Sequence, residues 1–417
     1  MIISFTRSNY LYPWQSRSHT NNFSLIQNNL PSPFVCSERE IMEVVVVIVG
    51  AGPAGLATSA CLNLHSIPNI VLEREDCSAS LWRKHTYDRI KLHLGKQFCA
   101  LPHMPFPPHA PTFVPKSGFL CYLDNYISEF DLNPFYNRKV ESAFYSEDNQ
   151  KWQVQAMNTT SNVLEHYVAQ FLVVATGENS LGVIPRLPGL ETFRGEYMHS
   201  SEYKNGKKYV NQDVLVVGVG NSGMEIAYDL SSTGANTSLS VRDKVHVLTK
   251  ELVYLGMSLL QYLPCKIVDL IILILRRLQF GDLADYGLQQ PENGPFYIKA
   301  IMGQSPTIDV GAMPKIKTGD IRIYPEISKV EGSKVVFANG KVDQFDAIIF
   351  ATGYKSTVLN WLKHEDNLFN EDGMPGQKFP NHWRGEKGLY CVGFAQRGLA
   401  GISKDAQNVA DDIRRML

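Results

Sequence analysis

The chain has 417 residues, a formal net charge of −1 and 44% hydrophobic residues. That length and hydrophobic content allow two domains with buried cores, and the balanced charge argues against a nucleic-acid partner. The 7 cysteines are scattered and include no CxxC pair, so we expect a reduced protein without a dithiol redox centre or a metal site. No apolar run reaches the roughly 18 residues that a membrane-spanning helix needs.

Residues 1–41 differ in composition from the rest. They are rich in Ser and Asn, lack hydrophobic periodicity and contain no acidic residue before Glu38. This composition is typical of an organelle transit peptide and equally of an unstructured leader. We expect a dispensable extension before Met42 and a cytoplasmic protein, with plastid targeting as the alternative.

An apolar run from Val44 leads into the first glycine-rich turn, GAGPAG. Its residues are Gly50, Ala51, Gly52, Pro53, Ala54 and Gly55. A strand, GxGxxG and a helix form the fingerprint of a dinucleotide site, in which the glycines admit a tight turn, a pyrophosphate and close helix packing. Glu73 ends the next short strand, 18 positions after Gly55 (73 − 55), where a carboxylate holds ribose hydroxyls. This acid would repel a 2′-phosphate, so the first site suits FAD.

A second fingerprint, GVGNSG, follows the apolar strand that starts at Asp213. Its residues are Gly218, Val219, Gly220, Asn221, Ser222 and Gly223. Here the next strand ends in Arg242, 19 positions after Gly223 (242 − 223), instead of an acid. Arginine recognises a 2′-phosphate, so the second site should prefer NADPH to NADH. Two fingerprints predict an α/β fold with two Rossmann-like domains.

The long segment after Glu73 is dense in aromatic, basic and proline residues. Long loops of this kind usually serve a site. We expect Arg74, Leu81, Trp82 and Arg83 to contact FAD, with Trp82 and Arg83 against the isoalloxazine ring. The alternative for Trp82 is packing beneath the loop.

Further along, residues 117–132 show helical spacing of apolar side chains, and strands follow over residues 152–157 and 166–174. Two strand ends carry the same tripeptide: Ala175, Thr176 and Gly177, then Ala351, Thr352 and Gly353. We assign the first to the FAD site and the second to the NADPH site. The predicted FAD-binding domain comprises residues 42–184 and 318–417, and residues 185–317 form the NADPH-binding domain inserted into it.

Three further features carry weaker predictions. Residues 193–203 have the spacing FxGxxxHxxxY, in which His199 by itself is more often structural than catalytic. Residues 267–275 predict a buried or amphipathic helix, with shallow membrane contact, such as peripheral ER association, or partner contact as the alternative. Ser403 is the expected N-cap of the terminal helix.

Together GAGPAG, FRGEYMHSSEYK, GVGNSGMEI, ATGY and GLAGISKDA resemble the class B flavin-containing monooxygenases, most closely the plant YUCCA family. The likeness covers residues 42–417. It implies FAD at the first fingerprint, NADPH at the second, and His199 and Tyr203 as members of the family signature. Val219 stands where such sequences often carry glycine. Lys96 and Gln97 occupy the loop in which other flavin monooxygenases place an asparagine near the flavin, which makes them flavin-edge candidates.

The resemblance implies oxidative decarboxylation of indole-3-pyruvate to indole-3-acetic acid in auxin biosynthesis, with O2 as co-substrate and a flavin C4a-peroxide as the reactive species. An N- or S-oxygenating monooxygenase is the nearest alternative, because it would share every motif. A non-catalytic NADPH-sensing module is a more distant one, which a colourless protein without FAD would favour. The oligomeric state cannot be read from the sequence.

Overall fold

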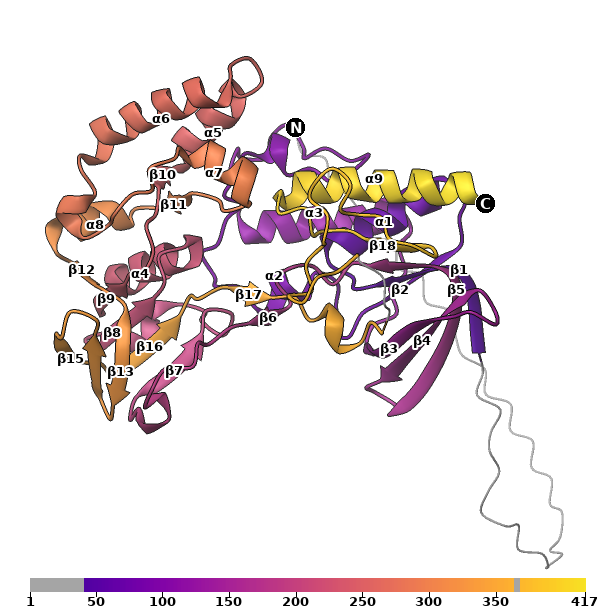
Figure 1. Ribbon diagram of the computed structural model, residues 1–417, viewed down its shortest axis with the longest axis horizontal. Helices are drawn as coiled ribbons and strands as arrows, with labels where there is room; N and C mark the ends of the chain where they lie inside the picture. The colour runs from indigo at the N-terminus through magenta and orange to yellow at the C-terminus, as the bar shows by residue number, and fades with distance from the viewer. Residues whose placement is uncertain (1–40, 364–367) are drawn as a thin grey trace, which may run out of the picture. The chain divides into compact units, whose positions relative to one another are not determined.

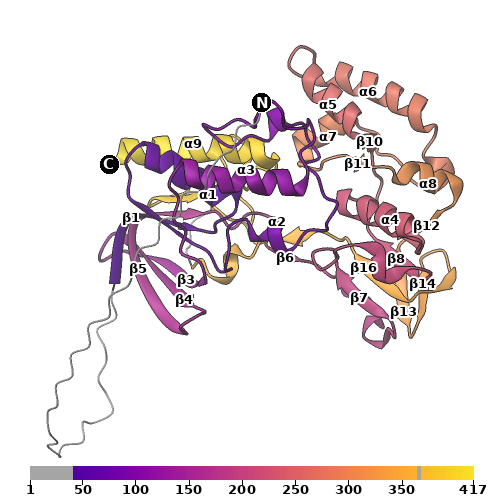
Figure 2. The ribbon, with the colours of Figure 1, turned by 180° about the vertical axis from the view of Figure 1, so that it is seen from behind.

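The computed structural model describes residues 41–363 and 368–417. Within these ranges the chain forms two largely parallel β-sheets with helices packed on them (Figures 1 and 2). This confirms the predicted α/β class with two Rossmann-like domains, the second inserted into the first. The predicted extension over residues 1–41 lies outside the described residues, except for Ile41, where the first strand begins.

The first sheet contains β1 (Ile41–Val49), β2 (Asn69–Leu72), β3 (Arg138–Ser146), β4 (Lys151–Asn158), β5 (Val163–Val174) and β18 (Leu389–Cys391). The strand order is β2-β1-β5-β4-β3, and β18 also pairs with β5. β1 runs parallel to β2 and β5, whereas β3 and β4 form an antiparallel extension. Alternate residues of β1 enter opposite cores: Val46 and Ile48 on one face, Val47 and Val49 on the other.

Helices α1 (Pro53–Leu64), α3 (Lys116–Glu129) and α9 (Gly398–Met416) contribute to the first of these cores. α9 buries Ala406, Val409, Ala410 and Ile413, the spacing of one helical face. The predicted helix over residues 117–132 is α3. The N-cap prediction at Ser403 is wrong, because α9 begins five residues earlier at Gly398. Two short helices, α2 (Ser80–Lys84) and η1 (Lys96–Phe98), interrupt the long loop.

The second sheet consists of five parallel strands in the order β12-β9-β8-β16-β7. They are β7 (Glu196–His199), β8 (Asp213–Val217), β9 (Asn236–Ser240), β12 (Ile321–Tyr324) and β16 (Ala347–Phe350). Helices α4 (Asn221–Thr233) and α8 (Ala312–Thr318) share its hydrophobic core.

The remaining elements extend the second sheet's domain or join the two domains, except η5, whose Val358 lies in the core of the first sheet. They are β6 (Leu181–Gly182), η2 (Leu190–Thr192), η3 (Gly206–Tyr209), β10 (Val247–Thr249), α5 (Lys250–Leu259), α6 (Cys265–Phe280), η4 (Ala284–Tyr286), α7 (Pro295–Met302), β11 (Thr307–Asp309), β13 (Ile327–Glu331), β14 (Lys334–Phe337), β15 (Val342–Gln344), β17 (Tyr354–Lys355) and η5 (Val358–Asn360). β10 and β11 pair in parallel, and β13, β14 and β15 form an antiparallel sheet.

The second domain extends beyond the predicted residues 185–317. The boundary at residues 317 and 318 is wrong, because β12 and β16 pair with β9 and β8 of the second sheet. β16 flanks the glycine-loop strand β8 on the side opposite β9, and β12 forms the edge of the sheet beside β9. The chain leaves the first domain through β6 and returns through β17, and the two crossings pair with each other antiparallel.

The apolar run over residues 267–275 is part of α6. As predicted, this helix is amphipathic. Over the described part of the chain, every helix is too short or too polar to span a bilayer.

Candidate active site

The turn between β1 and α1 has the geometry of a phosphate-binding loop. Gly50 has φ +107°, and a Cβ at Gly55 would lie 1.8 Å from the Gly50 carbonyl oxygen. At Gly52 a Cβ would meet no atom within 4 Å. No side chain caps α1, whose first residues are Pro53 and Ala54, so the helix dipole and its N-terminal N–H groups are open to an anion.

Glu73 directs its carboxylate onto this loop. It follows β2, is buried, and accepts hydrogen bonds from the Ala51 N–H at 2.7 Å and the Glu75 N–H at 3.0 Å. Burial raises the pKa of Glu73, and the two N–H donors oppose that shift. The carboxylate predicted to hold a ribose therefore lies beside the predicted pyrophosphate loop.

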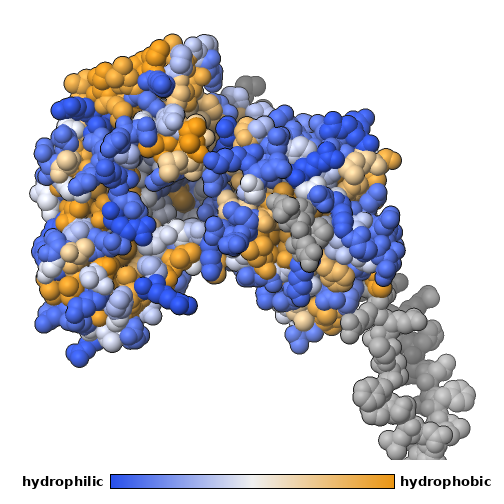
Figure 3. All heavy atoms as spheres, viewed as in Figure 1, coloured by the Kyte–Doolittle hydropathy of each residue, from blue (hydrophilic) through white to orange (hydrophobic). Residues whose placement is uncertain are grey.

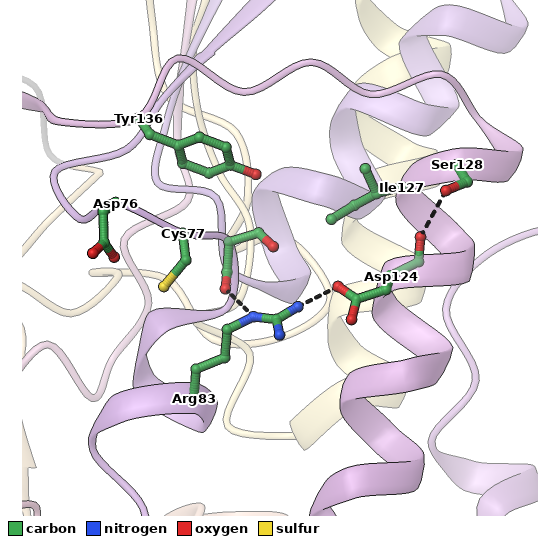
Figure 4. A pocket seen from close by; sticks show the side chains of 8 residues that line it. Asp76, Cys77, Arg83, Asp124, Ile127, Ser128 and Tyr136 are labelled. Atoms are coloured by element: carbon green, nitrogen blue, oxygen red, sulfur yellow. Dashed lines mark hydrogen bonds and ion pairs between the residues drawn. The ribbon is translucent and has the colours of Figure 1, made fainter. Parts of the chain in front are cut away.

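A cavity of about 410 Å³ lies beside the segment that follows Glu73, between this segment and α3 (Figure 4). It is lined by Asp76, Cys77, Ser78, Arg83, Asp124, Ile127, Ser128 and Tyr136. Arg83 crosses it: its Nε donates to the Ser78 carbonyl oxygen at 2.9 Å, and its Nη2 pairs with Asp124 of α3. The volume is in the range of small-ligand pockets.

The predicted flavin contacts of this region all have neighbours within the protein. The Trp82 ring meets Phe119 edge-on with 4.6 Å between centroids, which is the packing alternative considered for this residue. Leu81 is half-buried beside it on α2, and the Arg74 side chain is half-exposed. Direct flavin contact by Arg74, Leu81, Trp82 and Arg83 remains a prediction.

The turn between β8 and α4 repeats the first loop. Gly218 has φ +106°, a Cβ at Gly223 would lie 1.9 Å from the Gly218 carbonyl oxygen, and Gly220 again has free space. No side chain caps α4, which begins with Asn221 and Ser222. β11 fastens this loop: the Thr307 hydroxyl donates to the Val219 carbonyl oxygen, and the Asn221 side chain accepts from the Ile308 N–H, both at 2.7 Å.

Each of the two repeated tripeptides lies against its own glycine loop. The Ala175 carbonyl oxygen is 2.7 Å from the position of a Cβ at Gly50, and the Ala351 oxygen is 2.6 Å from the equivalent position at Gly218. The Thr176 hydroxyl is buried without a hydrogen-bond partner, whereas the Thr352 hydroxyl donates to the Val183 carbonyl oxygen. The close approach of these carbonyl oxygens leaves no room for a side chain at Gly50 or Gly218.

Arg242 lies two residues beyond β9, the strand next to β8. Its side chain is 68% exposed and pairs with the neighbouring Asp243 at 2.8 Å. The guanidinium is thus on the surface at the carboxyl edge of the sheet, where the sequence predicts a 2′-phosphate contact.

The described geometry has counterparts among known proteins. The family model "Flavin-binding monooxygenase-like" matches residues 43–365. Probable indole-3-pyruvate monooxygenase YUCCA10 of Arabidopsis thaliana is 53% identical over 90% of this chain and 98% of its own length, and indole-3-pyruvate monooxygenase YUCCA6 of the same plant is 47% identical over 88% and 90%. The chain belongs to the YUCCA family of flavin-containing monooxygenases.

Solved structures share the fold of this YUCCA-family enzyme. The flavin-containing monooxygenase from Stenotrophomonas maltophilia has a TM-score of 0.67 at 18% identity and covers 90% of this chain and 99% of its own. The OTEMO complex with FAD and NADP has a TM-score of 0.68 at 15% identity, covering 89% and 86%.

His199 of the family signature holds the two crossings between the domains. It is buried at the end of β7, with Nε2 2.9 Å from the Gly353 carbonyl oxygen and Nδ1 2.9 Å from the Ser201 hydroxyl. A Cβ at Gly182 would lie 2.2 Å from its ring. His199 thus contacts both segments that connect the two domains, at Gly182 and Gly353. These contacts fit the structural role considered for it.

The protonation of His199 should be visible in the pH dependence of stability. Burial lowers its pKa, so the unfolded state binds a proton more readily. Stability from the neutral ring is present above the unfolded pKa of about 6.5 and is lost as pH falls towards the folded pKa. We expect His199→Gln to lower the thermal midpoint at pH 7.5 and to flatten its decline between pH 7 and 5.5. Parallel pH curves for variant and wild type would contradict this.

A polar cluster on α4 was not among the predicted site residues. Buried Glu225 accepts from the Tyr87 hydroxyl at 2.8 Å and lies 3.2 Å from His93 Nε2. One turn later Asp229 accepts from the Tyr203 hydroxyl at 2.6 Å, so this signature residue is structural as well. The cluster attaches the loop after Glu73 to the helix of the second glycine loop. A signal was available, since Glu225 and Asp229 are four residues apart on one helical face.

A double-mutant cycle tests this attachment. Tyr87→Phe should lower the thermal midpoint by about 2–4 °C, because it removes one buried hydrogen bond. In a Glu225→Gln background the same change should have a clearly smaller effect, because the charged acceptor is already gone. Additive midpoint shifts would show that the two side chains do not stabilise each other. Thr86→Ser, on the same loop but outside the cluster, serves as the control.

The flavin-edge candidates Lys96 and Gln97 lie in η1. The Lys96 ammonium donates to the carbonyl oxygens of Pro107, Pro108 and Ala110 at 3.0, 2.8 and 2.6 Å. All three of its protons are therefore used to fasten its own loop. Gln97 is exposed, next to Gly95. Their role at the flavin remains a prediction.

A second missed group follows the first tripeptide. Glu178 has a buried Oε2 without a hydrogen-bond partner, and burial raises its pKa. Lys299 of α7 donates to the Gly303 and Gln396 carbonyl oxygens at 2.8 and 2.5 Å, and burial lowers its pKa while Glu178 opposes that shift. Lys299 lies in the stretch of the sequence with the weakest pattern, so no signal identified it.

Proposed function

We propose that this enzyme binds FAD at the loop of Gly50, Gly52 and Gly55 and NADPH at the loop of Gly218, Gly220 and Gly223. Both loops have an uncapped helix and a central glycine facing free space, which fits a pyrophosphate. Beside the first loop, the unpartnered Thr176 hydroxyl and Glu178 carboxyl are buried polar groups that a bound ligand would satisfy.

The proposed reaction converts indole-3-pyruvate, O2, NADPH and a proton into indole-3-acetic acid, CO2, NADP⁺ and water. The observation that carries the proposal is the 53% identity, over 98% of its length, to a relative named as a probable indole-3-pyruvate monooxygenase. Bound FAD, once reduced by NADPH, would supply the activation of O2, which no side chain can provide.

The chain's own residues would bind and orient the two nucleotides. Glu73 would hold the ribose of FAD and disfavour a 2′-phosphate, and Arg242 would select that phosphate at the second loop. His199 would keep the crossings next to both loops in a fixed geometry through Gly353 and Gly182. A rigid, water-poor site limits the loss of reducing equivalents as hydrogen peroxide.

Product analysis tests the proposal. The FAD-loaded enzyme is incubated with NADPH, air and indole-3-pyruvate, and with a sulfide and an amine in parallel, and products are identified by mass spectrometry. Indole-3-acetic acid above the enzyme-free background, with little peroxide, is the expected result. Oxygenated sulfide or amine without indole-3-acetic acid would overturn the proposed substrate.

A further inference from the structure

Lys299 is a half-buried lysine in the last turn of α7. Its ammonium donates to the Gly303 carbonyl oxygen at 2.8 Å and to the Gln396 carbonyl oxygen at 2.5 Å. Gly303 ends α7 with φ +74°, and a Cβ there would lie 1.8 Å from Gln396 Oε1. The end of α7 therefore packs directly on Gln396, and the Lys299 ammonium is held at this contact.

Gln396 places this ammonium at the carboxyl edge of the first sheet. β18 runs parallel to β5, and after β18 the chain contacts the start of α1, where a Cβ at Gly393 would lie 3.1 Å from Ala54 Cβ. Gln396 follows three residues later, with φ +54°. Ligands of parallel α/β sheets bind at the carboxyl ends of the strands. Lys299 thus reaches from α7 to the edge of the first sheet at which FAD is proposed to bind.

The Lys299 ammonium has one hydrogen-bond donor left for a ligand. An ammonium has three N–H donors, and the described contacts of Lys299 use two of them. Burial lowers the pKa of Lys299, the charge of Glu178 opposes that shift, and the charge of Arg397 adds to it. The Glu178 Oε2 is buried without a hydrogen-bond partner, so this atom does not accept from the third donor. A ligand anion can accept from it instead.

Exposed apolar side chains lie at the same end of α7. Ile301 and Met302 are 53% and 69% exposed, and Phe379 is 37% exposed, with the Arg397 guanidinium carbon 4.0 Å from its ring centroid. Lys378, next to Phe379, donates to the Ile301 carbonyl oxygen at 3.2 Å, which joins this segment to α7. Figure 3 shows the surface hollowed just below the place at which Figure 1 draws α7. A ligand bound there would meet a cation together with apolar side chains.

An aromatic 2-oxo acid matches these features better than the other reactants of the proposed reaction. The phosphates of FAD and NADPH already have the uncapped helices α1 and α4, and O2 carries no charge. A carboxylate accepts a charge-assisted hydrogen bond from an ammonium, and the aromatic group suits apolar side chains. The carboxylate of a 2-oxo acid is bonded to the carbonyl carbon that reacts, so a residue that holds the carboxylate also positions that carbon.

We propose that the Lys299 ammonium binds the carboxylate of the 2-oxo acid substrate and thereby selects an acid over a neutral ketone. This inference rests on the proposed function, because it names the residue that recognises that substrate. Lys299 holds the carboxylate both before and during attack on the neighbouring carbonyl carbon. It therefore contributes to substrate affinity and KM, and little to kcat.

Binding without turnover tests the proposal. The FAD-loaded enzyme, kept oxidised in the presence of NADP⁺, is titrated by calorimetry with phenylpyruvate and with its methyl ester, which lacks the negative charge. Lys299→Met should weaken phenylpyruvate binding roughly ten- to a hundredfold, because a charge-assisted hydrogen bond is lost, and should leave ester binding within about twofold. Lys299→Arg should recover most of the affinity, because arginine keeps the charge. In steady-state assays Lys299→Met should raise the KM for indole-3-pyruvate by a similar factor with kcat nearly unchanged.

Lys378→Met is the matched control. Lys378 is exposed and also donates to a carbonyl oxygen of α7, so its loss reports how far loosening of this helix alone affects binding. This variant should bind phenylpyruvate like wild type. Thermal midpoints and the retained flavin absorbance show that each variant is folded and loaded with FAD.

Four results would overturn the assignment of Lys299. They are equal phenylpyruvate affinity in wild type and Lys299→Met, an equal loss of affinity for the ester, an equal loss in Lys378→Met, and a wild type that binds the acid no more tightly than the ester. The proposed function fails separately, if wild type forms no indole-3-acetic acid. Indole-3-acetic acid formed with an unchanged KM in Lys299→Met would leave the proposed function intact and overturn the role of Lys299 alone.

Discussion

Alanine at Gly55 is expected to destabilise the protein and abolish FAD retention, whereas alanine at Gly52 should abolish retention alone. The methyl group of Gly55→Ala would lie 1.8 Å from the Gly50 carbonyl oxygen, which is backbone and can move only if β1 and α1 separate. Overpacking of this kind costs about 3 kcal/mol or more, equivalent to a thermal midpoint lower by about 5–10 °C.

Gly52→Ala separates folding from binding. Its backbone, at φ −72° and ψ −179°, suits alanine, and the methyl group would meet no protein atom within 4 Å. The added methyl instead occupies the space proposed for the pyrophosphate, so FAD affinity should fall roughly 10- to 100-fold. The checks are the thermal midpoint of the apoprotein and the flavin absorbance retained after gel filtration. Full FAD retention by Gly52→Ala would show that the first loop is not the FAD phosphate site.

The glycine loops could be predicted from sequence because their requirements are local. A positive φ at Gly50 and Gly218, and backbone contact at Gly55 and Gly223, each demand glycine within a six-residue window. The strand before each loop and the helix after it are set by equally local hydrophobic patterns. For the same reason the helical spacing of residues 117–132 predicted α3 with its buried face.

The domain boundary could not be predicted so directly. Strand order is a long-range property, and nothing in the four-residue strands β12 and β16 says which sheet they join. The orientation of α6 has the same origin. Its sequence shows an aliphatic stripe, but only the buried partners of Asp269 and Arg276 decide that the stripe faces outward. At the terminal helix, the N-cap preference of Ser403 did not locate the start, since α9 begins at Gly398 and Ser403 lies within it.

The site residues also differ in whether local sequence or long-range contacts determine their position. Glu73 was predictable because its distance from Gly55 is set by one helix and one short strand, and its carboxylate does reach the Ala51 N–H. The contacts of Lys96 and Glu225 were not predictable, because their partners lie on other segments: carbonyl oxygens between Pro107 and Ala110 for Lys96, and the Tyr87 hydroxyl for Glu225. Contacts between a loop and a distant helix leave no periodic trace in the sequence.

Replacement of Arg242 by alanine should raise the KM for NADPH by roughly 10- to 100-fold and leave that for NADH nearly unchanged. A guanidinium-phosphate hydrogen bond is charge-assisted, and its loss costs about 1.5–3 kcal/mol. NADH has no 2′-phosphate and loses nothing when Arg242 is removed. Because the side chain is exposed and pairs only with the adjacent Asp243 among its described contacts, the protein should fold as before.

Asp243→Asn provides the opposing test. In the free protein Asp243 holds the Arg242 guanidinium and places a negative charge where the 2′-phosphate is proposed to bind. Neutralising it should lower the KM for NADPH, again with little effect on NADH, and raise the preference between the two nicotinamides. Steady-state kinetics with both cofactors measure the two variants together. Equal changes in the KM for NADPH and for NADH in Arg242→Ala would exclude Arg242 as the phosphate contact. The 2′-phosphate is the group that distinguishes the two cofactors, so a residue that binds it should affect NADPH alone.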